Sequence, residues 1–212
     1  MTTMSPPRLW QITLLLVLCL ALSYVPQPQE FLDPLCFATR AELDQALDDY
    51  LSGQEARRAD VELVYGPIES WCTTHITDFS HLFDGYLYPS FNEDIGGWDL
   101  SNAKTAAGMF FRATSFNSDI SSWDVSNLED MSGMFAFAAS FSVDLSNWST
   151  GKVKYMRAAF DGAESFQECH SFIEWDISSV IDATSMLLGS GCDRQEELVA
   201  LLGEEAFDET SV

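Results

Sequence analysis

The chain has 212 residues, and its 10 Lys and Arg against 33 Asp and Glu give a formal net charge of −23. Hydrophobic residues make up 47% and aromatic residues 13%, too many for a disordered acidic tail, so a packed core is expected. Such an acidic surface repels polyanions, which argues against nucleic acid as a partner and against docking on an anionic membrane.

The first 23 residues have the pattern of a secretory signal peptide. Arg8, the only charge in that segment, precedes an apolar stretch over 9–22. Ala21 and Ser23 place small residues where a signal peptidase requires them, which predicts cleavage after Ser23. An uncleaved signal anchor is the alternative, although the stretch is short for ~30 Å of hydrocarbon. We therefore expect a secreted or cell-surface protein that is not inserted in a membrane after cleavage.

Residues 64–192 form a repeat, which the tryptophans mark most clearly. Phenylalanines recur in step with them, at a spacing of 25 residues. A period of 20–50 residues indicates an array in which each unit buries its apolar face by stacking on its neighbours. We predict five coils of 25–27 residues, in register with five tryptophans: Trp71, Trp98, Trp123, Trp148 and Trp175.

Each coil is expected to contain a short helix and a short strand. Met131, Met134, Phe135 and Ala138 lie at i, i+3, i+4 and i+7, which predicts one face of a helix. The segment 116–125 alternates loosely and holds turn formers, which predicts a strand around the tryptophan. The predicted fold is an α/β solenoid, a leucine-rich-repeat-like stack. Its predicted core includes Trp98, Phe116, Trp123, Met134, Phe135, Phe141 and Trp148.

A helix is expected to cap each end of the array, since the terminal faces of a stack must be covered. Thr39 and Glu42 form a capping box that opens an N-terminal helix within the segment 36–63, of which 54–63 is expected to be a linker. A second capping helix is expected over 193–207.

Four cysteines follow the signal segment, and three pairings are possible. Cys36–Cys72 would fasten the first helix to the first coil. Cys169–Cys192 would join two residues one coil apart, which can approach the 5–6 Å Cα separation of a disulfide. A bond between the first and last coils would have to span close to 20 Å, so we predict these two local pairs. The cysteines and histidines show no metal-site spacing, which argues against zinc.

At the family level the motif is recognisable. The segment 116–127, followed by Met131, Met134, Phe135 and Ala138, resembles the repeat of the BspA-like surface proteins of mycoplasmas, other bacteria and unicellular algae. The resemblance covers 64–192. It implies a secreted or surface-exposed repeat protein with a role in adhesion or protein binding rather than catalysis.

Two columns of aspartates are the candidates for chemistry. Asp94, Asp119 and Asp144 share one column, and stacked carboxylates repel unless something offsets their charge. We expect each to accept backbone N–H groups of the following turn, and a shared calcium ion is the alternative. The pair Asp119 and Asp124 could suggest a glycosidase. However, a catalytic pair is unique, whereas this one recurs in other coils.

The sequence therefore predicts a monomeric, non-enzymatic binding or adhesion module without a cofactor, for an extracellular protein or glycan partner. The tryptophan column could form a sugar platform, but its register with the core columns favours burial. An extracellular polysaccharide-acting enzyme that uses the acidic columns, or a calcium-binding solenoid, is the alternative.

Overall fold

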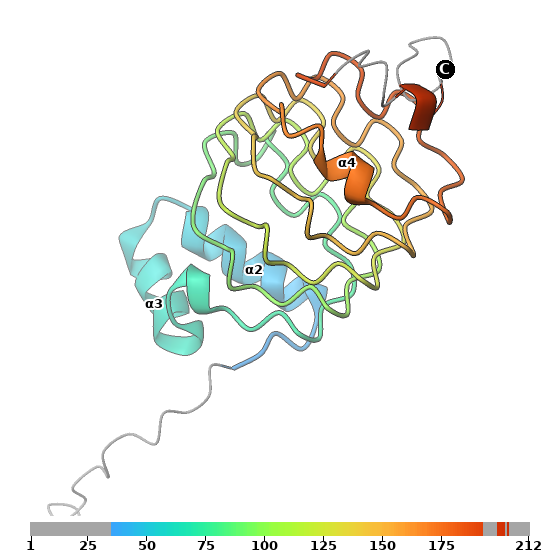
Figure 1. The fold of residues 1–212 in the computed structure, drawn as a ribbon. Helices are drawn as coiled ribbons and strands as arrows, with labels where there is room; N and C mark the ends of the chain where they lie inside the picture. Colours follow the sequence, from blue (N-terminus) through green and yellow to red (C-terminus); the bar gives the residue numbers. More distant parts are fainter. Residues whose placement is uncertain (1–34, 193–198, 202, 204–212) are drawn as a thin grey trace, which may run out of the picture. The chain divides into compact units, whose positions relative to one another are not determined.

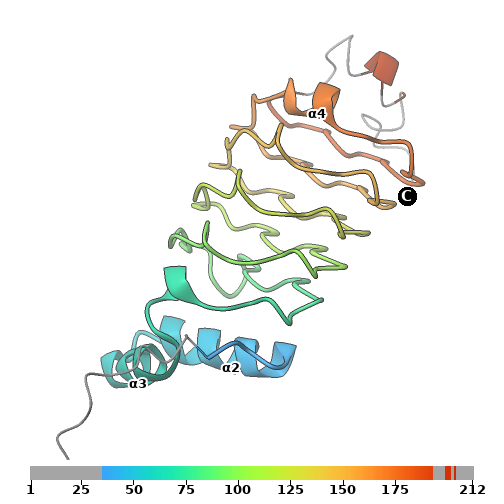
Figure 2. The ribbon, with the colours of Figure 1, turned by 60° about the horizontal axis from the view of Figure 1, so that its bottom comes forward.

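The structure is a computed structural model, and it describes residues 35–192, 199–201 and 203. Two helices, α2 (Arg40–Leu51) and α3 (Glu55–Tyr65), come first, and a short 3₁₀ helix, η1 (Ile68–Ser70), leads into a stack of coils (Figures 1 and 2). A one-turn helix, α4 (Ser171–Glu174), lies in the last coil. The expected signal segment, 1–23, lies outside the described residues. The expected C-terminal capping helix, 193–207, also lies outside them except for residues 199–201 and 203.

Helix α2 begins where its capping residues place it. The Thr39 hydroxyl accepts the Glu42 N–H at 3.2 Å, and the Glu42 carboxylate accepts the Ala38 N–H at 2.9 Å. Leu43, Ala46, Leu47 and Tyr50 are buried on one face of the helix. The Tyr50 ring lies 5.5 Å from that of Trp71, so this face covers the first coil.

The prediction of a linker over 54–63 is wrong, because most of that segment belongs to α3. Helix α3 packs against α2 and buries only Val61 among its residues. One buried position gives almost no periodic apolar signal, so the sequence pattern could not distinguish this helix from a linker.

The prediction of an α/β solenoid is also wrong, because residues 35–192 contain only four short helices and no strand. The coils consist of successive turns, as in the segment 105–113. Alternate N–H groups close turns inside the coil, as from Met109 to the Ala106 carbonyl at 3.1 Å. The intervening groups donate to the next coil, as from Gly108 to the Ser132 carbonyl at 2.8 Å. In the described residues, parallel pairing is limited to isolated bridges. One joins Cys36 to Cys72, and the others follow one column: Asp78, Thr105, Asp130, Tyr155 and Asp182.

Left-handed backbone explains why the apolar spacing did not produce a helix. An α-helix requires right-handed φ angles and a bond from each N–H to the carbonyl four residues before it. Gly133 and Phe137 lie inside the expected helix with φ of 60° and 59°. Their N–H groups donate to the next coil instead, at 2.8 and 2.7 Å. A run of turns can thus place apolar residues at i, i+3, i+4 and i+7 without being helical.

The core consists of aromatic columns that run through the stack. Phe116 stacks on Phe91 at 6.2 Å and on Phe141 at 5.9 Å between ring centroids. Each indole N–H donates to a backbone carbonyl of an earlier segment, as from Trp123 to Ile95 at 3.1 Å. All seven expected core residues are buried: Trp98, Phe116, Trp123, Met134, Phe135, Phe141 and Trp148.

Two disulfides lie at opposite ends of the stack. Cys36 pairs with Cys72 at a Cα separation of 4.4 Å, and Cys169 pairs with Cys192 at 5.5 Å. Both are consistent with the pairing expected from the sequence. No helix in the described part of the chain is long and apolar enough to cross a membrane.

Candidate binding surface

The aspartate side chains of the first column accept hydrogen bonds from the backbone of their own turns. Asp94, Asp119 and Asp144 each accept the N–H two residues later, at 2.9–3.0 Å. The backbone N–H of Ser146, helped by the Ser171 hydroxyl and by His170, lowers the pKa of Asp144 to about 2. Hydrogen bonds from Ser121 likewise lower the pKa of Asp119. Hydrogen bonds within the local turn thus favour the ionised form of Asp119 and Asp144.

The second acidic column has the same arrangement. Asp99, Asp124 and Asp176 each accept the N–H two residues later, and these serines lower the pKa of all three. Within the described ranges, no three His, Cys, Asp or Glu side chains gather in a group able to hold a metal ion. The structure therefore does not bring Asp94, Asp119 and Asp144 together as calcium ligands.

The tryptophan column does not offer a sugar platform. All five indoles are buried, and neighbouring ones stack, as Trp123 does on Trp148 at 6.4 Å. Their N–H groups bond to backbone carbonyls inside the stack. A stacked sugar would need an exposed ring face, which this column does not present.

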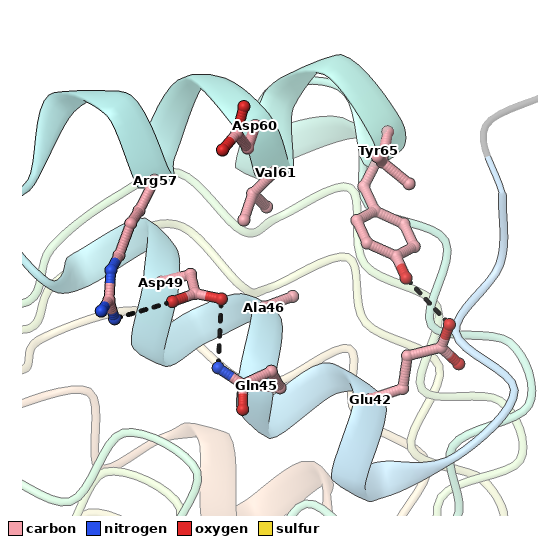
Figure 3. A pocket seen from close by; sticks show the side chains of 9 residues that line it. Glu42, Gln45, Ala46, Asp49, Arg57, Asp60, Val61 and Tyr65 are labelled. Carbon is pink, nitrogen blue, oxygen red and sulfur yellow. Dashed lines mark hydrogen bonds and ion pairs between the residues drawn. The ribbon is translucent and has the colours of Figure 1, made fainter.

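A cavity of about 360 Å³ lies between α2 and α3 (Figure 3). Its floor is apolar, but its charged groups bind one another. Arg57 donates to Asp49 at 3.1 Å, Gln45 donates to Asp49 at 3.0 Å, and Tyr65 donates to Glu42 at 2.8 Å. The Arg57–Asp49 and Tyr65–Glu42 pairs hold the two helices together, so these polar groups are explained by the packing of α2 against α3.

The exposed edge of the turn segments carries a different group, here called the Arg112 cluster: Tyr86, Phe111, Arg112 and Phe137. The Arg112 guanidinium carbon lies 5.0 Å from the centroid of Tyr86 and 5.3 Å from those of Phe111 and Phe137. The rings also contact one another, at 6.1 Å for Tyr86–Phe111 and 5.9 Å for Phe111–Phe137. The cation is thus held among three aromatic rings that belong to three successive coils.

Backbone strain accompanies this cluster. Arg112 and Phe137 have φ of 58° and 59°, the left-handed region that favours glycine. The corresponding positions of the next two coils are Gly162 and Gly189, each with φ of 64°. A non-glycine residue there costs about 1–2 kcal/mol. Three non-glycine residues outside the cluster, His81, Ala158 and Ser185, also have positive φ angles, at a second repeated position. Two adjacent coils thus carry bulky side chains where later coils have glycine.

Neighbouring residues hold the rings in place. A Cβ on Gly162 would lie 2.6 Å from the Phe137 ring, so the missing side chain makes room for that ring. Tyr86 comes from the segment 84–90, which carries two residues more than the equivalent turn of the next coil. The Asp84 carboxylate accepts the Tyr86 N–H at 2.9 Å and shapes this longer turn.

Arg112 also differs from most of the cations in the described part of the chain. Within the described residues its side chain has no ion pair and no hydrogen-bond partner, although the chain carries an excess of acid. Several other cations have carboxylates within 4 Å: Arg40, Arg57, Arg58, Lys104 and Lys154.

A comparison with known protein families finds a match for this chain. The family described as "Mycoplasma protein of unknown function, DUF285" matches residues 54–172 and 86–196. The chain belongs to this DUF285 family. The match supports the BspA-like resemblance at the level of the family, and the two disulfides of this DUF285 chain fit an extracellular or surface protein. No curated protein and no solved structure matches it.

Sequence reasoning missed the Arg112 cluster in this DUF285 chain. Two signals were present: the extra residues in 84–90, and the replacement of glycine by Arg112 and Phe137 in one repeat column. Neither stands out unless the backbone is known, because only the positive φ angles reveal that the column favours glycine. Insertions in single repeats do tend to lie on binding faces.

Proposed function

We propose that this DUF285 protein is a secreted or cell-surface binding module of the BspA-like kind, which presents the Arg112 cluster to a protein or glycan partner. The observation that carries the proposal is an exposed arginine among three aromatic rings on strained backbone. Arginine and aromatic residues are enriched among the residues that contribute most to binding at interfaces. The signal peptide over 1–23 and a repeat of about 25 residues are parts of the same proposal.

A binding role also agrees with how the carboxylates are used. A glycosidase needs one carboxyl group that donates a proton and one that acts as nucleophile or base. Asp119 and Asp124 instead accept N–H groups of Ser121 and Ser126, and their pKa values are lowered rather than raised. We therefore propose a protein that is not an enzyme and needs no cofactor.

Binding to intact cells tests the proposal. The full chain is expressed with its own leader in a secreting host, labelled, and titrated onto cells from the source environment. We expect saturable binding that falls at least tenfold in the double variant Arg112→Gln/Phe137→Ala. Lys152→Gln, which removes one exposed cation bonded to Asn127 outside the cluster, should bind as the wild type does. Unsaturable binding, or equal binding by the double variant, would contradict the proposal.

A further inference from the structure

We propose that the Arg112 cluster binds one carboxylate of a partner protein, supplied by an aspartate or glutamate that is flanked by aromatic or aliphatic side chains in an extended peptide segment. This inference rests on the proposed binding role and names the ligand of the same surface.

The donors of Arg112 favour a carboxylate. The three rings hold the guanidinium by cation–π contact, and such contact uses none of its N–H groups as ordinary hydrogen-bond donors. No described residue accepts a hydrogen bond from these N–H groups or forms an ion pair with them. A planar guanidinium has its donors in a fork that matches a carboxylate with two parallel hydrogen bonds. Rings that hold the cation in place also reduce the entropy lost on binding.

The apolar surface beside Arg112 favours a flanking apolar side chain. Tyr86 is 70% exposed and Phe137 is 41% exposed. Both rings contact the guanidinium of Arg112, one from the preceding coil and one from the following coil, so a ligand that engages the cation also covers them. Burial of this apolar surface would supply affinity, while the carboxylate would supply orientation.

A peptide fits this surface better than a glycan. A polyanionic glycan is opposed by the net charge of −23, and a neutral glycan would leave the Arg112 charge without a partner. A protein segment can place a single carboxylate between apolar side chains. The rings of the cluster are spaced by 6.1 and 5.9 Å, close to the roughly 6.6 Å between side chains on one face of an extended peptide.

Peptide display on the intact protein tests the inference. A random 12-residue library is selected on the wild type, and recovered peptides are measured by fluorescence anisotropy. We expect recovered peptides to share an Asp or Glu next to an aromatic or aliphatic residue. Replacing that acid by its amide, or introducing Arg112→Gln, should weaken binding at least tenfold. Arg112→Lys should weaken it less, and Lys152→Gln should leave it unchanged. Circular dichroism and thermal melts confirm that each variant is folded.

Three results would overturn the inference: no enriched peptides, enriched peptides without an acid, or equal binding by Arg112→Gln. A hexuronic acid oligosaccharide is measured in parallel, and Arg112-dependent binding of that probe without peptide binding would also overturn it. The cell-binding titration separates the two proposals. If cells bind through the Arg112 cluster but no peptide does, the binding role stands and the peptide ligand fails. If neither depends on Arg112, both fail.

Discussion

Arg40 donates a hydrogen bond of 2.9 Å from its guanidinium to the backbone carbonyl oxygen of Ser80. In the four coils that follow, the equivalent carbonyl accepts an N–H from the preceding coil, as Ala107 does from His81 at 3.0 Å. A second bond from Arg40 reaches the Asp78 carbonyl at 3.0 Å. A side chain of α2 thus satisfies acceptors that a further coil would otherwise satisfy, and it ends the stack at this side.

Arg40→Met keeps the length of this side chain but removes its donors. Because one of these hydrogen bonds is exposed and the other is only partly buried, water can replace part of the loss, and we expect the free energy of unfolding to fall by about 1–2 kcal/mol. Urea unfolding followed by tryptophan fluorescence measures it. Arg57→Met is the control, since it removes only the exposed ion pair with Asp49 and should cost less than ~0.5 kcal/mol. Equal losses in both variants would show that Arg40 does not seal the stack.

Gly162→Ala tests how Phe137 is held. The new Cβ would meet both a φ of 64° and the Phe137 ring at 2.6 Å. Gly133→Ala is a matched control, because its φ is 60° while the nearest atom to a Cβ is 4.0 Å away. In both variants the free energy of unfolding should fall by about 1–2 kcal/mol, because a residue with a Cβ is strained at a positive φ. Only Gly162→Ala should shift the NMR signals of the Phe137 ring and weaken binding at the Arg112 cluster. Identical behaviour of the two variants would mean that the ring does not depend on this glycine.

Phe116→Ala removes a ring from the middle of an aromatic column. Phe116 is fully buried and stacks on Phe91, Phe110 and Phe141. We expect a loss of about 3–5 kcal/mol in the free energy of unfolding. Tyr86→Ala, at an exposed ring of the Arg112 cluster, should cost less than ~1 kcal/mol. A stability loss at Tyr86 as large as that at Phe116 would show that the cluster is part of the core.

The folded state should lose stability in acid through Asp144. Its pKa falls from 3.8 to about 2, so the folded protein binds the proton more weakly than the unfolded chain does. Its contribution is fully present above about pH 4 and is lost as the pH falls towards 2. The substitution Asp144→Asn leaves no titrating group at this position. The stability difference between wild type and variant should therefore shrink between pH 4 and 2 in urea unfolding experiments. A difference that stays constant over this range would exclude such a shift.

How far the sequence predicts this molecule depends on the kind of interaction. Burial recurs with the repeat, so Phe116, Trp123 and Phe135 could be assigned to the core from spacing alone. The local backbone structure could not be predicted from spacing, because helices and successive turns place apolar side chains at the same spacing. What separates them is the destination of each N–H, which for Phe135 is the Ala159 carbonyl of the next coil at 2.8 Å. The glycines at 108 and 133 were the available sign, since each interrupts an expected helix.

The Arg112 cluster could not be predicted from the sequence for a related reason. Its members come from three separate segments of the chain, around Tyr86, Phe111 and Phe137, and they are not part of the periodic apolar core pattern. Their proximity depends on how each coil turns at its edge, and those turns rely on positive φ angles that a sequence does not display. By contrast, the aspartates that accept N–H groups two residues later were predictable, because that interaction is local.

The two disulfides determine which segments would carry a pulling force. Between Cys36 and Cys72 lie α2, α3 and η1, and between Cys169 and Cys192 lies most of the last coil. Tension applied from residue 35 to residue 192 would pass through each sulfur–sulfur bond and bypass both enclosed segments. Only the backbone from 72 to 169 would bear the load, and the Arg112 cluster lies within it. A partner pulling on this surface would thus strain the coils that form it while both ends of the stack stay closed.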